Sequence, residues 1–400
     1  MRTAAIICEC NPPHAGHARI LAEARRNSDC VVCLMSGPFV QRGEAAILTP
    51  HARAGILLRM GADLVLELPF PYAASGAETF AAGAIAILSR LGVNALWFGS
   101  ETADLPLLSR LASVAETPDF RARYASRLIT DATAGTAALW SETLSEFCGL
   151  SAPLAPNDLL AVSYLRAVIS QNSALTPRAF PRSGSADSET ALPPAGTIPS
   201  AAALRRAIFA GNLQGVYAFL PDFVSSVIAS ESTAGRFPIT LDHAAPAILS
   251  HLRLCDPDSF GEIAELSGGL GRRLRKAALS AADLSSLLSL ASTKKYPLAR
   301  LRRGILFSLL GVTRSDLSAP PSYVRLLASN ARGSAFLASI RRTSSIPVVT
   351  SNAGVSALPF ARRQDDLSRR ALSLFALCFP SPVAPSDLLR ENPVFGSEDG

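Results

Sequence analysis

Two histidines near the start of the chain, His14 and His17, have a spacing that suits a phosphate site. They lie in His-Ala-Gly-His, after an apolar run at 4–8 and Glu-Cys-Asn-Pro-Pro at 9–13. The apolar run predicts a buried strand, Asn-Pro-Pro ends it, and residues 17–26 predict a helix with one apolar face. The tetrapeptide also fits histidines that only cap a helix. The strand-to-helix context favours phosphate binding, with the imidazoles stabilising charge as pyrophosphate leaves.

Strand and helix patterns alternate through the first hundred residues. After the first strand and helix, the sequence predicts strands at 31–35, 62–68 and 94–98, and helices at 49–60 and 75–91. This alternation predicts an α/β fold, a Rossmann-like parallel sheet with helices on both faces. The loops at the carboxyl ends of such strands carry function, and here they are 9–17, 36–44, 69–75 and 99–101.

Length and composition limit the class of protein. The chain has 400 residues, 48% of them hydrophobic, with a mean hydropathy of +0.26 and a net charge of +6. It is long enough for two or three domains with large cores. No apolar run reaches the ~18 residues that span a bilayer, and the first apolar run is too short for a signal peptide. We therefore expect a cytoplasmic protein with no membrane contact.

The seven cysteines are dispersed along the chain, which argues against a disulfide framework. Cys30 and Cys33 have the spacing of a redox or zinc pair. They lie inside an apolar strand pattern, however, and no second pair of ligands accompanies them. Packing in the core is the favoured interpretation.

The choice of cations excludes one kind of nucleotide site. Lysine occurs only at positions 276, 294 and 295. A phosphate loop of the GxxxxGK[ST] type is therefore excluded from the first 275 residues. If this part of the chain binds a nucleotide, histidines, arginines and backbone amides must neutralise its phosphates.

The rest of the chain is predicted to be mainly helical, at 105–150, at 157–169 and from 213 onwards. We divide it into a nucleotide-binding domain, 1–212, and a helical region, 213–400. A segment rich in Ser, Gly, Ala and Pro, 183–199, predicts a mobile loop. The helical region contains a basic stretch with the aromatic Tyr296 and one acid, Asp283. It suits RNA, although a solvated helix face is the commoner meaning of such a run. Its cations are Arg272, Arg273, Arg275, Lys276, Lys294, Lys295, Arg300, Arg302 and Arg303.

Two segments carry a family resemblance. Residues 9–17 resemble the ExNPxHxGH signature of the HxGH nucleotidyltransferase superfamily, and residues 35–45 resemble the MSGxFxQRGEPA segment of one branch. Further matching segments follow in order over nearly the whole chain: 61–69, 98–101, 156–160, Arg182, 200–205, 293–300 and 321–327. That branch is the bacterial tRNA(Met) cytidine acetate ligase family, which the chain resembles.

The resemblance implies an ATP-dependent ligase that joins acetate to tRNA. It would form acetyl-adenylate from ATP and acetate, then transfer the acetyl group to N4 of the wobble cytidine (position 34) of elongator tRNA(Met). Mg²⁺ would accompany ATP, but the sequence contains no dedicated carboxylate cage, so no metal ligand is assigned. No membrane and no stable protein partner are expected.

The resemblance also implies roles for individual residues. His14 and His17 would be catalytic, and Gln41 and Arg42 would form a substrate loop. The ATP site would include both histidines with Ile7, Cys8, Glu9, Asn11, Pro12, Gly16, Ile20, Gly99, Asn157, Arg182, Ser200 and Arg205. The tRNA site would comprise Arg272, Arg273, Lys294, Lys295, Arg300, Arg302 and Arg303.

Three departures from the family pattern concern substrate contacts. Ala202 stands where a threonine is usual, residues 185–189 replace a Gly-Tyr-His-Asp element, and Phe375 occupies a tyrosine position. Two rival functions stay open from the residues. One is an adenylyltransferase acting on a small phosphate ester, which needs no basic second half. The other is an RNA-binding protein with a decayed nucleotide site, against which His14, His17 and Arg182 count.

Overall fold

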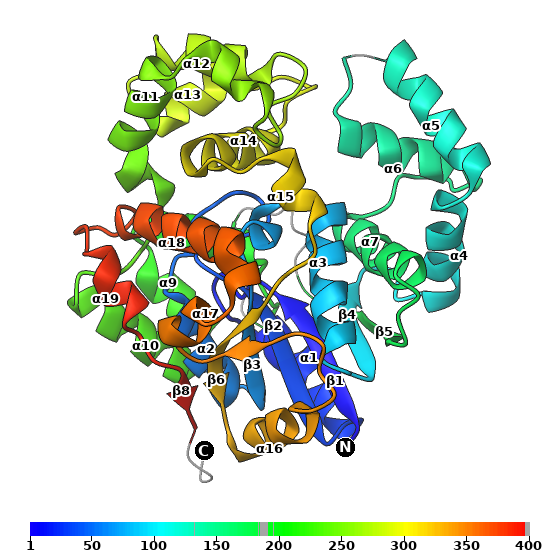
Figure 1. Ribbon diagram of the computed structural model, residues 1–400, viewed down its shortest axis with the longest axis vertical. Coiled ribbons are helices and arrows are strands. Elements are labelled where there is room, and N and C mark those ends of the chain that lie inside the picture. The colour runs from blue at the N-terminus through cyan, green and yellow to red at the C-terminus, as the bar shows by residue number, and fades with distance from the viewer. Residues whose placement is uncertain (132, 183, 185–190, 195, 397–400) are drawn as a thin grey trace.

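The computed structural model describes residues 1–131, 133–182, 184, 191–194 and 196–396. At its centre is an eight-stranded sheet in the order β5-β4-β1-β2-β3-β6-β7, with β8 beside β6 (Figure 1). The strands are β1 (Thr3–Cys8), β2 (Cys30–Ser36), β3 (Leu64–Leu68), β4 (Ala95–Ser100), β5 (Thr176–Pro181), β6 (Val324–Ser329), β7 (Val348–Val349) and β8 (Val394–Phe395).

The strand order places the functional loops at one point of the sheet. Strands β1 to β5 are parallel, and β1 lies between β2 and β4. The chain proceeds from β1 towards β3 on one side, and β4 and β5 lie on the other side. The loops that leave β1 and β4 therefore diverge and open a crevice at the carboxyl edge, where open α/β sheets bind ligands.

Helices cover both faces of the sheet, as the alternation predicted. On one face, α1 (Ala15–Arg26) and α2 (Pro50–Arg59) pack on the side chains of β1 and β2, with Leu21 and Leu57 fully buried. On the other face lie α3 (Ala77–Arg90), α4 (Leu105–Ala115), α7 (Pro156–Ser170) and α16 (Ala331–Ile340). The predicted α/β class is confirmed.

Local signals set the helix ends. Thr49 accepts a hydrogen bond from the Ala52 amide and caps α2, and Pro50 takes the first helical position as predicted. The long helix predicted at 105–150 is three helices: α4, α5 (Pro118–Thr130) and α6 (Thr136–Phe147). Pro118 cannot continue α4, because it lacks an amide hydrogen. It takes the first position of α5 instead.

The second half adds two helical groups. The first packs on α2 and comprises α8 (Ala201–Phe209), α9 (Leu213–Tyr217) and α10 (Asp222–Thr233). The second, which we call the upper lobe, is α11 (Ala245–Leu254), α12 (Leu270–Ala278), α13 (Leu284–Ala291) and α14 (Leu298–Leu310), with α18 (Arg362–Ala376) beneath it (Figure 1). Short elements complete the chain: α15 (Arg314–Ser318), α17 (Asn352–Ser356), α19 (Pro385–Leu389), η1 (Tyr72–Ala74), η2 (Leu241–Ala244), η3 (Pro257–Gly261) and η4 (Pro359–Ala361).

The upper lobe shares a core with the loops that follow β2 and β3. The Phe39 ring contacts that of Phe375 at 5.9 Å between centroids, and the Phe70 ring contacts that of Phe307 at 6.0 Å. Phe375, at the position where a tyrosine was expected, is fully buried. The lobe is therefore packed firmly over the carboxyl edge of the sheet.

Four strands lie outside the predicted set. Strand β5 is half exposed and contains Pro177 and Pro181, so its sequence has no apolar run that would predict a strand. Strand β6 runs antiparallel to β3, and β7 and β8 pair with it. The sheet thus takes strands from both sides of position 212. The division of the chain at that position stays a prediction.

Other expectations concern cysteines, metals and membranes. All seven cysteines are free, and Cys30 and Cys33 are buried in β2, as expected of core residues. Within the described ranges, no group of three His, Cys, Asp or Glu side chains is placed to hold a metal ion. No helix in the described part of the chain is long and apolar enough to cross a membrane.

Candidate active site

A cavity of about 560 Å³ opens at the carboxyl ends of β1 and β4. We call it the switch-point cavity. Its walls come from both halves of the chain, because Ala137 of α6 and Ala299 of α14 line it together with the loop after β1. Fourteen residues predicted for the sites line it: Ile7, Cys8, Glu9, Asn11, His14, Gly16, His17, Ile20, Gln41, Arg42, Gly99, Asn157, Arg182 and Arg303.

The two histidines are fixed by hydrogen bonds at the first turn of α1. The Gly16 amide donates to His14 Nδ1 at 3.0 Å, and the His14 amide donates to His17 Nδ1 at 3.2 Å. The rings lie 4.1 Å apart between centroids. A Cβ at Gly16 would lie 2.7 Å from the His14 ring, which explains why glycine stands between the histidines.

This arrangement determines the protonation of both rings. Each Nδ1 accepts a backbone hydrogen, so each neutral ring carries its proton on Nε2 and can donate it to a ligand oxygen. Burial lowers the pKa of His14 well below its usual value, with further lowering by His17, Arg182 and Arg205. Burial also lowers the pKa of His17. With each Nδ1 accepting a backbone hydrogen and both pKa values lowered, we expect the rings to act as neutral donors rather than as the positive charges expected from the sequence.

Glu9 and Asn11 lie on the loop between β1 and His14. Glu9 Oε1 accepts the Gln41 amide hydrogen at 2.8 Å, and burial raises the pKa of Glu9. Asn11 Oδ1 accepts the Ile47 amide hydrogen at 2.9 Å, whereas Asn11 Nδ2 is buried with no partner in the described chain. Since Asn11 lines the cavity, its amide group is a donor for a ligand.

A buried arginine that sequence reasoning missed holds the strand ends. Arg53 on α2 is 0% exposed and donates to four carbonyl oxygens. These belong to Glu9 at 2.7 Å, Ser36 at 3.0 Å, Leu48 at 3.3 Å and Gly37. It thereby ties the loop after β1 to the loop after β2. The sequence did indicate that Arg53 is buried, because it falls in an apolar stripe with Ile56 and Leu57 at helical spacing.

Asn157 and Arg182 form one connected group. Glu101 accepts hydrogen bonds from the Asp158 amide at 2.9 Å and from Asn157 Nδ2 at 2.6 Å. Arg182 Nη1 then donates to Asn157 Oδ1 at 2.8 Å. A Cβ at Gly99 would lie 3.2 Å from Arg182 Cγ, so the missing side chain makes room for this arginine.

Three predicted ATP-site residues do not line the cavity: Pro12, Ser200 and Arg205. Ser200 caps α8 by accepting the Ala203 amide hydrogen at 3.1 Å, and its neighbours Pro199 and Ala201 do line the cavity. Arg205 donates to the Asn11 carbonyl at 2.7 Å. The unusual residues at 185–189 lie outside the described residues, as do 183, 190 and 195 of the predicted loop at 183–199.

Glu44 connects this side of the site to the upper lobe. Its carboxylate pairs with Arg205 at 3.2 Å and with Arg302 of α14 at 3.1 Å. Gly43 has a φ of 72°, and a Cβ there would lie 2.7 Å from the Arg303 backbone nitrogen. The Gln-Arg-Gly-Glu loop therefore needs its glycine to pack against α14.

The predicted tRNA-binding residues divide into two sets. The three on α14 are largely buried in ion pairs: Arg302 with Glu44, and Arg300 and Arg303 with Glu265 at 3.6 and 2.8 Å. Outside α14, Arg272 and Lys294 are exposed, Arg273 donates to the Ala291 carbonyl, and Lys295 lies over the Tyr296 ring.

Tyr296, the aromatic residue of the basic stretch, is not placed to stack on a base. The residue is only 8% exposed, its ring contacts Lys295 and Arg300, and its hydroxyl donates to the Gly268 carbonyl. A ring that is buried on this scale cannot present a face to a nucleotide.

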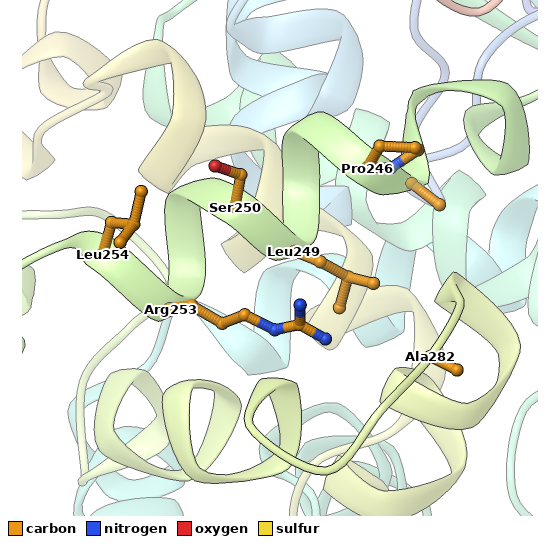
Figure 2. A pocket seen from close by; sticks show the side chains of 7 residues that line it. Pro246, Leu249, Ser250, Arg253, Leu254 and Ala282 are labelled. Atoms are coloured by element: carbon orange, nitrogen blue, oxygen red, sulfur yellow. The ribbon is translucent and has the colours of Figure 1, made fainter.

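A second concavity, of about 540 Å³, lies on the upper lobe between α11 and the turn before α13 (Figure 2). Its lining is mostly apolar, with Leu249, Leu254 and Ala282. The one charged lining residue, Arg253, donates to the carbonyls of Ala278 and Ala281. Its described lining contains one hydroxyl, that of Ser250, and no acid or base to activate it.

Comparison with known proteins agrees with the geometry. Residues 1–386 match the model of the HIGH Nucleotidyl Transferase family. A relative from Acetivibrio thermocellus, named tRNA(Met) cytidine acetate ligase, is 32% identical and the match covers 96% of each chain. One of the same name from Caldicellulosiruptor saccharolyticus is 35% identical over 85% of each. Crystal structures of Thermotoga maritima TmcAL, apo and bound with alpha-thio ATP, give TM-scores of 0.91 and 0.89 at 28% identity over 99% of each chain.

The fold and the cavity define an α/β nucleotide-binding protein with an HxGH motif at the switch point of its sheet. The chain belongs to the HIGH nucleotidyl transferase family and, within it, to the family of tRNA(Met) cytidine acetate ligases. The resemblance carried by residues 9–17 and 35–45 is confirmed.

Proposed function

We propose that this protein uses ATP to activate acetate as acetyl-adenylate and transfers the acetyl group to N4 of the wobble cytidine, position 34, of elongator tRNA(Met). The observation that carries the proposal is the switch-point cavity, lined by His14, His17 and arginines. It occurs in a chain matched nearly end to end by tRNA(Met) cytidine acetate ligases. A structural relative that binds alpha-thio ATP supports ATP as the nucleotide.

In the first half-reaction, an acetate oxygen attacks the α-phosphorus and pyrophosphate leaves with the electrons of the broken P–O bond. This step needs alignment and charge stabilisation rather than a covalent nucleophile. We assign His14 Nε2–H and His17 Nε2–H to the phosphate oxygens, with the Asn11 amide group beside them. Positive charge comes from arginines that line the cavity, Arg182 among them.

In the second half-reaction, N4 attacks the acetyl carbon and AMP leaves. The acetyl-adenylate, a mixed anhydride, must react with the cytidine before it reacts with water. Phe98, Tyr164 and Phe180 line the cavity with apolar surface, which limits the water near the anhydride.

The remaining partners follow from the same proposal. Any Mg²⁺ that accompanies ATP would be held mainly by phosphate oxygens and water, because Glu9 is the one carboxylate among the described cavity-lining residues. Exposed cations of the upper lobe, Arg272 and Lys294, suit the phosphates of tRNA. We place the reaction in the cytoplasm, where tRNA and ATP are available.

The test is product formation. The protein is incubated with ATP, acetate and bulk tRNA, and the digested tRNA is searched for N4-acetylcytidine by mass spectrometry. Reactions without acetate, and with acetyl-CoA in place of both ATP and acetate, should give no product. Pyrophosphate release without modified tRNA would instead indicate another acceptor, and neither product would indicate an RNA-binding protein.

A variant separates the two half-reactions. His14→Ala should abolish acetate-dependent pyrophosphate exchange, because it removes a donor to the leaving pyrophosphate, and should leave tRNA binding close to normal. His243→Ala is the matched control, since that histidine is exposed beside α11. Substantial exchange activity in His14→Ala would remove the catalytic role proposed for this residue.

A further inference from the structure

Glu9 brings a negative charge to a site that binds anions, which is unexpected. It is the one carboxylate among the described residues that line the switch-point cavity. Acetate and the triphosphate are both negative, so an acidic side chain beside them opposes their binding. Beyond its structural contact with the Gln41 amide, a carboxylate there suits a step in which neither anion is its partner.

The position of Glu9 is fixed from two sides. Its backbone carbonyl accepts a hydrogen bond from Arg53 at 2.7 Å, and its Oε1 accepts the Gln41 amide hydrogen at 2.8 Å. Oε2 accepts no hydrogen bond from the described residues, which leaves one carboxylate oxygen for a ligand. Glu9 follows directly from β1, so it stands next to the histidine motif in the chain.

The acceptor of the proposed reaction supplies such a ligand. The lone pair on cytosine N4 is delocalised into the ring, so this nitrogen becomes nucleophilic as its proton leaves. The group that proteins use to accept a hydrogen bond from cytosine N4 is a carboxylate. A general base must lie within hydrogen-bond reach of the proton that it removes.

We propose that Glu9 is a catalytic residue of the transfer step, which accepts a hydrogen bond from the cytidine N4 amine and then takes its proton. The C–N bond forms between N4 and the acetyl carbon, the bond from that carbon to the AMP oxygen breaks, and AMP leaves with its electron pair. One N4 proton passes to Glu9 Oε2. This inference rests on the proposed function and adds the group that handles the acceptor. It assigns the Glu9 side chain to the cytidine rather than to ATP, where the resemblance placed this residue.

The other titratable groups of the cavity are poorly placed for this role. His14 and His17 each use Nδ1 as an acceptor for a backbone hydrogen and carry the ring proton on Nε2, so they donate. Tyr164 is buried, and burial raises its pKa well above the usual value, so the phenol keeps its proton. Interactions with Cys10 and Cys33 lower the pKa of the Cys8 thiol well below its usual value, which makes it a weaker base than an ordinary thiolate.

The electrostatic surroundings of Glu9 agree with the geometry. Burial raises the pKa of Glu9, while the Gln41 amide and the charges of Arg205 and Arg42 oppose that rise and Glu44 adds to it. A carboxylate whose pKa is raised is a stronger base than an exposed one.

The test measures the two half-reactions separately on the full chain. Glu9→Gln keeps the size of the side chain and an oxygen for the Gln41 amide. We expect acetate-dependent ATP–pyrophosphate exchange to stay within about 3-fold of wild type, with no rise in the KM for ATP. We expect single-turnover acetyl transfer to tRNA to fall about 100-fold, the usual contribution of a general base. Glu23→Gln, a surface carboxylate on α1 paired with Arg26, should change neither.

A second variant guards against a folding artefact. Glu9→Asp keeps the carboxylate one methylene further back and should transfer acetyl about 10-fold faster than Glu9→Gln. Equal transfer by the two variants would overturn the proposal. So would an equal loss of exchange and transfer in Glu9→Gln, or a raised requirement for ATP or Mg²⁺, since either would place Glu9 at the nucleotide.

The outcomes also separate this inference from the proposed function. If the wild-type protein forms no N4-acetylcytidine, the function fails, and with it the step assigned to Glu9. If the wild-type protein forms the product and Glu9→Gln transfers acetyl at the same rate, the function stands and only the role of Glu9 is refuted.

Discussion

Arg53 offers the sharpest test of how the sheet holds its active-site loops. Replacing it with methionine keeps most of the side-chain volume and removes every donor. Three of its four hydrogen bonds lie in the interior, to the carbonyls of Ser36, Gly37 and Leu48, and the fourth carbonyl, that of Glu9, borders the cavity. Water can replace the arginine at Glu9 but reaches the other three poorly.

The expected loss of stability follows from that count. A buried carbonyl left without a partner costs about 1–3 kcal/mol. Three of them cost at least about 3 kcal/mol, and relief of the desolvation of the buried guanidinium, which lowers the pKa of Arg53 to about 10, offsets the upper part of the range. We therefore expect Arg53→Met to lower the free energy of unfolding by roughly 3–5 kcal/mol. It should also reduce pyrophosphate exchange at temperatures where the variant is folded, because the loops after β1 and β2 are no longer tied together.

Urea unfolding followed by tryptophan fluorescence measures this effect. Trp97 lies in β4, in the same core cluster as the buried face of α2, and Trp140→Phe removes the second tryptophan. The matched control is Arg59→Met, an exposed arginine of α2 over the Phe223 ring, which should cost about 0.5–1 kcal/mol. If Arg53→Met costs less than ~1 kcal/mol, or no more than the control, the four hydrogen bonds do not hold the strand ends.

Two further predictions concern pH and salt. The pKa values of His14 and His17 are lowered by burial from the usual value of 6.5, so we expect both rings to be mainly neutral at pH 6.5 and above. Pyrophosphate exchange should therefore stay constant as pH falls from about 8 to about 6.5. An acidic limb centred at or above 6.5 that disappears in His14→Asn would show instead that the imidazolium reacts. Arg272→Ala combined with Lys294→Ala should weaken tRNA binding and reduce its salt dependence by about two phosphate contacts, measured by filter binding across a salt series; an unchanged slope would remove both from the interface.

The pH prediction has a consequence for stability as well. A histidine whose pKa is lower in the folded state than in the unfolded state binds fewer protons when folded. Its contribution to stability is complete above the unfolded value of 6.5. It is lost as pH falls from 6.5 towards the lowered values of the folded protein. The histidine motif therefore destabilises the fold only in acid.

The sequence predicted the first four strands because each is a short apolar run followed by a turn, and their neighbours are amphipathic helices. It did not predict β6, although Val324–Ser329 is apolar, because a leucine-rich segment within helical surroundings fits either structure. Strand pairing with β3, some 260 residues away in the chain, is a property of the tertiary structure. Local patterns carry no information about it.

The site was predictable in its residue types but not in its charges. Spacing placed His14 and His17 at the strand-to-helix junction, and the structure brings them into one cavity with Arg182, as predicted. The neutral state of the rings depends on burial and on which backbone hydrogen each Nδ1 accepts, and neither is visible in a sequence. The same applies to α14, where a run of arginines resembled an exposed RNA surface. Its members face Glu44 and Glu265 instead.

The distribution of charge around the cavity explains why the two halves of the chain must act together. With the histidines neutral, the cations among the described residues that line the cavity are Arg19, Arg42, Arg182 and Arg303, each on a different segment. Arg303 belongs to α14, and Glu44 binds both Arg302 of that helix and Arg205 of α8. Displacement of α14 would therefore move Arg303 away from the cavity and break the ion pair that joins Glu44 to this helix. We therefore expect adenylation to depend on residues beyond position 212, although the histidine motif ends at His17.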